Sequence, residues 1–129
     1  MRQISGLIIL QTKIKIFIYS FINNASVIPV QHPGLLYDSD LVNEVTSVNI
    51  ASQTILIKNF SKYFLKNKKR GRIINISSMA AALNENGTSI YAASKIFIEK
   101  FLSIFSKELS KTKITCNTIG ITYFNSQTF

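Results

Sequence analysis

The chain has 129 residues, 47% of them apolar and 16% charged, a composition typical of one globular domain and not of a disordered chain. Lysine and arginine number 15 against 6 acidic residues, which gives a formal charge of +9. This charge permits an anionic partner but does not require one. The only dense basic run covers residues 66–72; we expect a solvated loop there, and no nucleic acid as partner.

Cysteine and histidine each occur once, as Cys116 and His32. This excludes an internal disulfide and offers no cluster with metal-ligand spacing, so we expect no metal. We expect Cys116 to be a small core residue and not a nucleophile. The apolar residues 4–22 are interrupted by a glutamine and two lysines. We therefore expect no signal peptide and no membrane anchor, and a cytoplasmic protein.

The first half of the chain predicts a strand followed by a long helix. Residues 14–22 are rich in β-branched and aromatic side chains, which is typical of a buried parallel strand, and this strand should end near Asn23. Residues 40–64 carry apolar side chains near helical spacing, with cap candidates at 38–40. These features favour a single long helix.

The second half predicts strand, helix and strand. Gly71 opens a short apolar strand at 72–77, and Ser89 can cap a helix over 90–109 that is apolar on more than one face. Such a helix needs additional cover, for example from a partner subunit. A last strand at 113–119 should stop at Gly120. The alternation indicates an α/β domain over residues 1–129, with a parallel sheet and right-handed connections.

Three side chains in this pattern suggest chemistry. Tyr91 and Lys95 are four residues apart in the predicted helix, so they share one face, and a nearby ammonium stabilises a phenolate. Ser78 follows the second strand, at the edge of the sheet where ligands collect in open parallel sheets. The three could polarise a carbonyl and supply a proton, whereas a hydride would have to come from a cofactor.

Several segments together resemble short-chain dehydrogenases/reductases. The strongest are residues 74–78, Ile-Asn-Ile-Ser-Ser, and 91–95, Tyr-Ala-Ala-Ser-Lys. Residues 23–26, Asn-Asn-Ala-Ser, are similar to the family's Asn-Asn-Ala-Gly turn. Shorter similarities occur at 48–50, 71–74 and 114–117, and the resemblance runs from about residue 14 to 122.

The resemblance implies a partial Rossmann-like, doubly wound parallel sheet with three central strands and two long helices, and NAD or NADP as cofactor. It makes Tyr91 the general acid/base, and Lys95 the group that favours the phenolate and binds the nicotinamide ribose. Ser78 would hold the substrate carbonyl. Asn49 would organise a water that connects Lys95 with solvent.

On the cofactor side, the resemblance implies that Asn24 and Ala25 line the adenosine part of the cleft, and that Thr122 offers backbone groups to the nicotinamide carboxamide. Simpler roles remain open at each position. A tyrosine on an apolar helix can belong to a core or an interface, a serine after a strand can be a cap, and Asn24 can support a turn.

The chain also departs from the family pattern. Gly6 is the only glycine before Asn23, so the glycine-rich turn that receives the pyrophosphate is missing, and the choice between NAD and NADP stays open. Ile119 precedes Gly120 where the family has proline. We therefore expect a chain truncated at both ends. Its first strand would have an unpaired apolar edge, so the chain should fold poorly alone or associate.

Two functions from different classes remain. The first is an oxidoreductase that interconverts a carbonyl and an alcohol on a small molecule by hydride transfer, incomplete or inactive as this chain. The second is a non-catalytic interaction module that pairs with a complete dehydrogenase subunit. We also expect a homo-oligomer that forms through the helices at 40–65 and 90–109.

Overall fold

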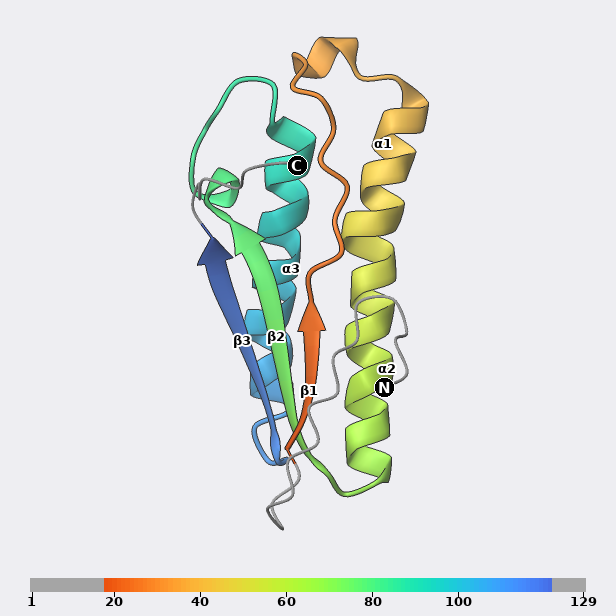
Figure 1. Cartoon of the computed structure of the whole chain (residues 1–129), viewed down its shortest axis with the longest axis vertical. Coiled ribbons are helices and arrows are strands. Elements are labelled where there is room, and N and C mark those ends of the chain that lie inside the picture. Colours follow the sequence, from red (N-terminus) through yellow and green to blue (C-terminus); the bar gives the residue numbers. More distant parts are fainter. Residues whose placement is uncertain (1–17, 122–129) are drawn as a thin grey trace, which may run out of the picture.

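The computed structural model describes residues 18–121 and shows a parallel three-stranded sheet in the order β1-β2-β3. The strands are β1 (Ile18–Asn23), β2 (Arg70–Ser78) and β3 (Ile114–Ile121). The helices are η1 (Gly34–Leu36), α1 (Ser39–Val45), η2 (Thr46–Ser52), α2 (Gln53–Lys66), η3 (Met79–Ala81) and α3 (Ser89–Glu108). This arrangement, drawn in Figure 1, confirms the Rossmann-like α/β fold.

β1 ends at Asn23 as expected, whereas β2 and β3 run past their predicted carboxyl ends. β2 begins two residues earlier, at Arg70, and ends one residue later, at Ser78. The expectation that the last strand stops at Gly120 was wrong, because Gly120 pairs with Ser77 and the strand continues to Ile121. A glycine keeps both backbone hydrogen-bonding groups, so it weakens a strand without ending it. Positions 14–17 of the first predicted strand lie outside the described residues.

The predicted long helix is present but has a wider turn in its middle. Residues 39–45 and 53–66 are α-helical, and residues 46–52 between them form a π-helix. Its buried side chains recur every four residues, at Val45, Asn49, Gln53, Ile57 and Ser61. In an α-helix this spacing drifts by about 40° per step. The i→i+5 turn of a π-helix reduces that drift and keeps the buried side chains in one row.

A side-chain cap marks the start of α1 but not the start of α3. Asp38 accepts a hydrogen bond from the backbone N–H of Leu41 at 2.7 Å, as the cap candidates at 38–40 suggested. The expected cap of the later helix was wrong. Thr88 occupies the N-cap position without a side-chain cap, and Ser89 lies inside the helix, with its Oγ 3.1 Å from the hydroxyl of Tyr37.

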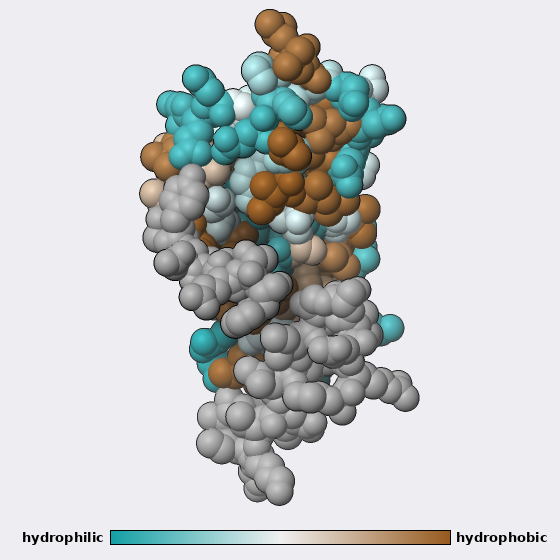
Figure 2. Space-filling view, turned by 45° about the horizontal axis from the view of Figure 1, so that its top comes forward, coloured by the Kyte–Doolittle hydropathy of each residue, from teal (hydrophilic) through white to brown (hydrophobic). Residues whose placement is uncertain are grey.

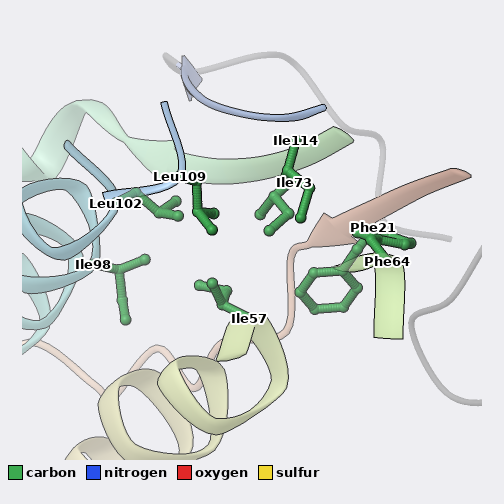
Figure 3. Close-up of a cluster of buried hydrophobic side chains, with 8 residues drawn as sticks. All are labelled: Phe21, Ile57, Phe64, Ile73, Ile98, Leu102, Leu109 and Ile114. Carbon is green, nitrogen blue, oxygen red and sulfur yellow. The ribbon is translucent and has the colours of Figure 1, made fainter. Parts of the chain in front are cut away.

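The apolar core lies between one face of the sheet and the helices α2 and α3. On β2, Ile73 points into it, and Arg72 and Ile74 point to the other face. Figure 3 shows side chains from both helices converging on this strand face. The cluster consists of Phe21, Ile57, Phe64, Ile73, Ile98, Leu102, Leu109 and Ile114. Toward the carboxyl ends of the strands the same face becomes polar, with Asn23, Asn75 and Ser77 buried.

Both long helices also carry apolar side chains outside the core, as expected for the helix at 90–109. On α3, Ile96, Phe97 and Ile104 are each nearly half exposed. On α2, the exposed apolar residues are Ile55, Leu56, Tyr63 and Leu65. No helix within residues 18–121 combines the length and the apolar character needed to cross a membrane.

Candidate active site

A pocket of about 580 Å³ opens at the carboxyl ends of the strands. Its walls come from the segment after β1, from the end of β2 and from the first turns of α3, through residues that include Asn24, Ser26, Ile28, Ser77, Ser78, Tyr91 and Lys95. Figure 2 turns this end of the molecule toward the viewer and shows apolar surface among polar surface there. Ile28 lines the pocket and is 71% exposed.

Tyr91 and Lys95 lie one turn apart on α3 and line the pocket together. Both are largely buried, with exposed fractions of 9% and 5%. The Lys95 ammonium lies 5.6 Å from the centre of the Tyr91 ring. Burial lowers the pKa of Lys95, because losing water disfavours its charged form. The ammonium is thus held beside the phenol in surroundings where charges interact more strongly than in bulk water.

Ser78 is the last residue of β2 and also lines the pocket. Its Oγ accepts a hydrogen bond from the backbone N–H of Ala80 at 3.2 Å, which starts the short helix η3. A hydroxyl that accepts one bond still has its own proton to donate. Ser78, Tyr91 and Lys95 therefore face the same cavity, although the tyrosine comes thirteen positions after the serine in the sequence.

Asn49, in the π-helical segment, is fully buried and is not among the residues that line the pocket. Its Oδ1 accepts from the backbone N–H of Val27 at 2.8 Å, and its Nδ2 donates to the Val27 carbonyl at 2.9 Å and to Ser94 Oγ at 3.1 Å. Ser94 Oγ in turn donates to the Tyr91 carbonyl at 2.7 Å. The amide thus connects the segment after β1 with the helix that carries Tyr91 and Lys95.

The three residues expected on the cofactor side have different positions. Asn24 lines the pocket. Ala25 does not, and its carbonyl accepts a hydrogen bond from Gln53 Nε2. Thr122 lies outside the described residues. Sequence analysis missed Gln53, although its position one helical turn after Asn49 was a signal that both amides face the same way.

Within residues 18–121, no three histidine, cysteine or acidic side chains come close enough to hold a metal ion. Cys116, on β3, is partly buried. Burial raises the pKa of the Cys116 thiol, as expected for a packed side chain and not for an activated nucleophile.

Comparison with known proteins gives one family. The family model described as short chain dehydrogenase matches residues 12–129. The chain is 34% identical over 108 residues to 2-dehydro-3-deoxy-D-gluconate 5-dehydrogenase of Formosa agariphila, a match that covers 83% of this chain and 40% of that protein. It is 30% identical over 102 residues to estradiol 17-beta-dehydrogenase 2 of Mus musculus, with 79% and 26% covered. The chain thus spans less than half the length of these curated relatives.

Among solved structures, 4-hydroxyisoleucine dehydrogenase complexed with NADH and succinate is 26% identical, with a TM-score of 0.75. That match covers 85% of this chain and 52% of the solved one. The family match covers the residues that form the pocket as well as all three strands. The chain belongs to the short-chain dehydrogenase family.

Proposed function

We propose that the protein is an NAD(P)-dependent oxidoreductase that interconverts a carbonyl and an alcohol on a small molecule, and that it works in the cytoplasm. The observation that most supports the oxidoreductase activity is the convergence of Ser78, Tyr91 and Lys95 on one pocket. Many relatives found by comparison are dehydrogenases or reductases, and solved neighbours carry NADH or NADP+.

The pocket residues fit the nicotinamide and ribose end of such a cofactor. A volume of about 580 Å³ lies within the usual range for small-molecule sites, and Lys95 offers a buried ammonium with three donors. Within residues 18–121, the four glycines at 34, 71, 87 and 120 form no glycine-rich turn for a pyrophosphate. The cofactor, when bound, supplies or accepts the hydride.

The chain's own residues would handle the proton and the polarised oxygen. Ser78 donates to the substrate carbonyl oxygen, and the Tyr91 hydroxyl gives its proton to that oxygen as negative charge develops. Lys95 stabilises the phenolate left on Tyr91 and holds the ribose. Asn49 positions α3 through Ser94. We also propose that Asn49 organises a water that connects Lys95 with solvent.

The test is oxidation of NADH and NADPH by the 129-residue chain against a panel of ketones and aldehydes. Removing the Tyr91 hydroxyl with Tyr91→Phe should lower the rate by about 10²–10⁴-fold, the usual contribution of a general acid. Tyr63→Phe is the matched control, because Tyr63 lies on α2 with 49% of its surface exposed. A rate that Tyr91→Phe leaves unchanged would refute the proposed role of Tyr91.

The exposed apolar side chains of α2 and α3 favour association as a second property. We propose a homo-oligomer that forms through helices 40–65 and 90–109; the rival is an inactive subunit that pairs with a complete dehydrogenase. Phe97→Glu on α3 should shift the mass in light scattering toward the monomer, and the exposed Lys107→Glu on the same helix should not. Association with no cofactor binding would favour the rival.

A further inference from the structure

The segment that follows β1 alternates between two environments. Residues Asn24, Ser26 and Ile28 line the pocket. The alternate residues, which are Asn23 at the end of β1, Ala25 and Val27, make hydrogen bonds to the side chains of Asn49 and Gln53 instead. Such alternation is the pattern of an extended chain, in which successive residues point to opposite sides. Contacts that hold one side of this segment in place therefore also determine how its other side faces the pocket.

Two buried amides one turn apart hold the inner side. Asn49 pairs with both backbone groups of Val27, at 2.8 and 2.9 Å. Gln53 accepts from Asn23 Nδ2 at 2.8 Å through its Oε1 and donates to the Ala25 carbonyl through its Nε2. Only this orientation of the Gln53 amide works, because a carbonyl can only accept and Asn23 Nδ2 can only donate.

The Gln53 contacts also reach the sheet. Asn23 Nδ2 makes a second bond, to Asn75 Oδ1 on β2 at 2.8 Å. Gln53, Asn23 and Asn75 are each 2–3% exposed. Their three amides therefore form a buried network that ties helix, segment and strand together. In such a network the loss of one member leaves buried polar groups of the others without partners.

We propose that Gln53 is a positioning residue for the cofactor side of the pocket. It fixes the Ala25 carbonyl and the Asn23 side chain, and so holds Asn24, Ser26 and Ile28 where they meet the ligand. This inference rests on the proposed function in one respect, which is that the ligand of the pocket is a nicotinamide cofactor. Gln53 is not among the residues that line the pocket, so it should affect cofactor affinity and leave the proton chemistry of Tyr91 unchanged.

The variant Gln53→Met keeps the length and approximate volume of the side chain but removes both hydrogen bonds. The segment should then hold its binding geometry for only part of the time. Apparent affinity falls by the fraction of molecules that are competent, so a segment ordered in one molecule in ten gives a dissociation constant about tenfold higher. Ser61→Ala is the matched control: Ser61 is equally buried on α2, and its hydroxyl bonds only to the Ile57 carbonyl of its own helix.

Two measurements on the 129-residue chain test the proposal. The first is amide hydrogen exchange without cofactor, in which Gln53→Met should speed exchange of the Val27 amide, which donates to Asn49, and leave the core amides of Ile73 and Ile98 protected. The second is fluorescence titration with NADH, in which Gln53→Met should weaken binding about tenfold and Ser61→Ala should not. If Gln53→Met does not fold, Gln53→Asn makes the same comparison, because it keeps a buried amide but is one methylene too short.

The outcomes separate the two proposals. If the original chain does not bind NADH, the proposed function fails, and the exchange data still decide whether Gln53 orders the segment. Unchanged exchange at the Val27 amide in a folded variant would overturn the role of Gln53. Faster exchange with unchanged NADH affinity would overturn its link to the cofactor.

Discussion

Replacing Asn49 by leucine should destabilise the fold strongly, although Asn49 does not line the pocket. The side chain is 0% exposed and makes three hydrogen bonds, two to Val27 and one to Ser94. Leucine has a similar size but neither donates nor accepts. The variant therefore leaves the N–H and the C=O of Val27 without their partner.

Each orphaned buried group costs about 1–3 kcal/mol. Two such groups give about 2–6 kcal/mol, and because Val27 is only half-buried, water can satisfy part of this demand. We therefore expect a loss of about 3 kcal/mol, a large part of the roughly 5–15 kcal/mol typical of a domain. With a urea m-value of about 1.5 kcal/mol per M, the midpoint should fall by roughly 2 M.

The assay is urea unfolding followed by circular dichroism, with Asn67→Leu as the control. Asn67 is exposed at the end of α2, and its Nδ2 bonds to the Tyr63 carbonyl at 2.7 Å. Surface substitutions of this kind usually change stability by about 0.5 kcal/mol or less. If Asn49→Leu unfolds within that margin of the original chain, the hydrogen bonds to Val27 do not hold the segment, and the reasoning is wrong.

Three further results are expected. Gly71→Ala should cost about 1–3 kcal/mol in urea unfolding, because the new Cβ would meet the ring of Phe64, with its Cγ at 2.7 Å; a neutral effect would contradict this packing. Lys95→Met should raise the free energy of unfolding by about 1 kcal/mol near pH 7 by removing a buried charge. Burial lowers the pKa of Lys95 in the folded state, so the stability of the original chain should rise with pH between this lowered pKa and the ordinary lysine pKa near 10.4. Thermal melts should therefore show that the stability gained by Lys95→Met becomes smaller over this pH range. Cys116 should react slowly with iodoacetamide at pH 7 and quickly only in urea, because burial raises its pKa.

Much of the fold could be predicted because the apolar pattern and the strand spacing carry it. The alternation of strand and helix patterns predicted the parallel sheet, and the family resemblance indicated the pocket residues Ser78, Tyr91 and Lys95. The position of Ser78 follows from topology, because it ends β2 and parallel strands bring their carboxyl ends to one edge.

Helix orientation near the pocket could not be predicted from hydrophobicity. The buried row of α3 is Tyr91, Ser94, Lys95, Ile98 and Leu102, whereas Ile96, Phe97 and Ile104 are exposed. Three large apolar side chains of this helix therefore do not face its own sheet. Apolar periodicity assumes that burial selects apolar side chains, but near a polar site burial selects amides, hydroxyls and an ammonium that find partners there.

The π-helical segment is a further feature without an apolar signal. Its buried residues at and after the wide turn, Asn49 and Gln53, are polar. Their shared direction follows from the contacts that they make with Val27, Ala25 and Asn23. Those contacts exist only once β1 and the segment after it are in place, so local sequence cannot specify them.

The most direct test of the central claim is a fluorescence titration of the 129-residue chain with NADH and NADPH. Lys95→Met is the variant, and Lys100→Met, exposed on the same helix, is its control. We expect saturable binding that Lys95→Met weakens at least about tenfold, since a hydrogen bond to a charged group contributes about 1.5–3 kcal/mol, and that Lys100→Met leaves unchanged. No binding up to millimolar cofactor, or equal affinity in the Lys95→Met variant, would contradict a nicotinamide site beside Tyr91.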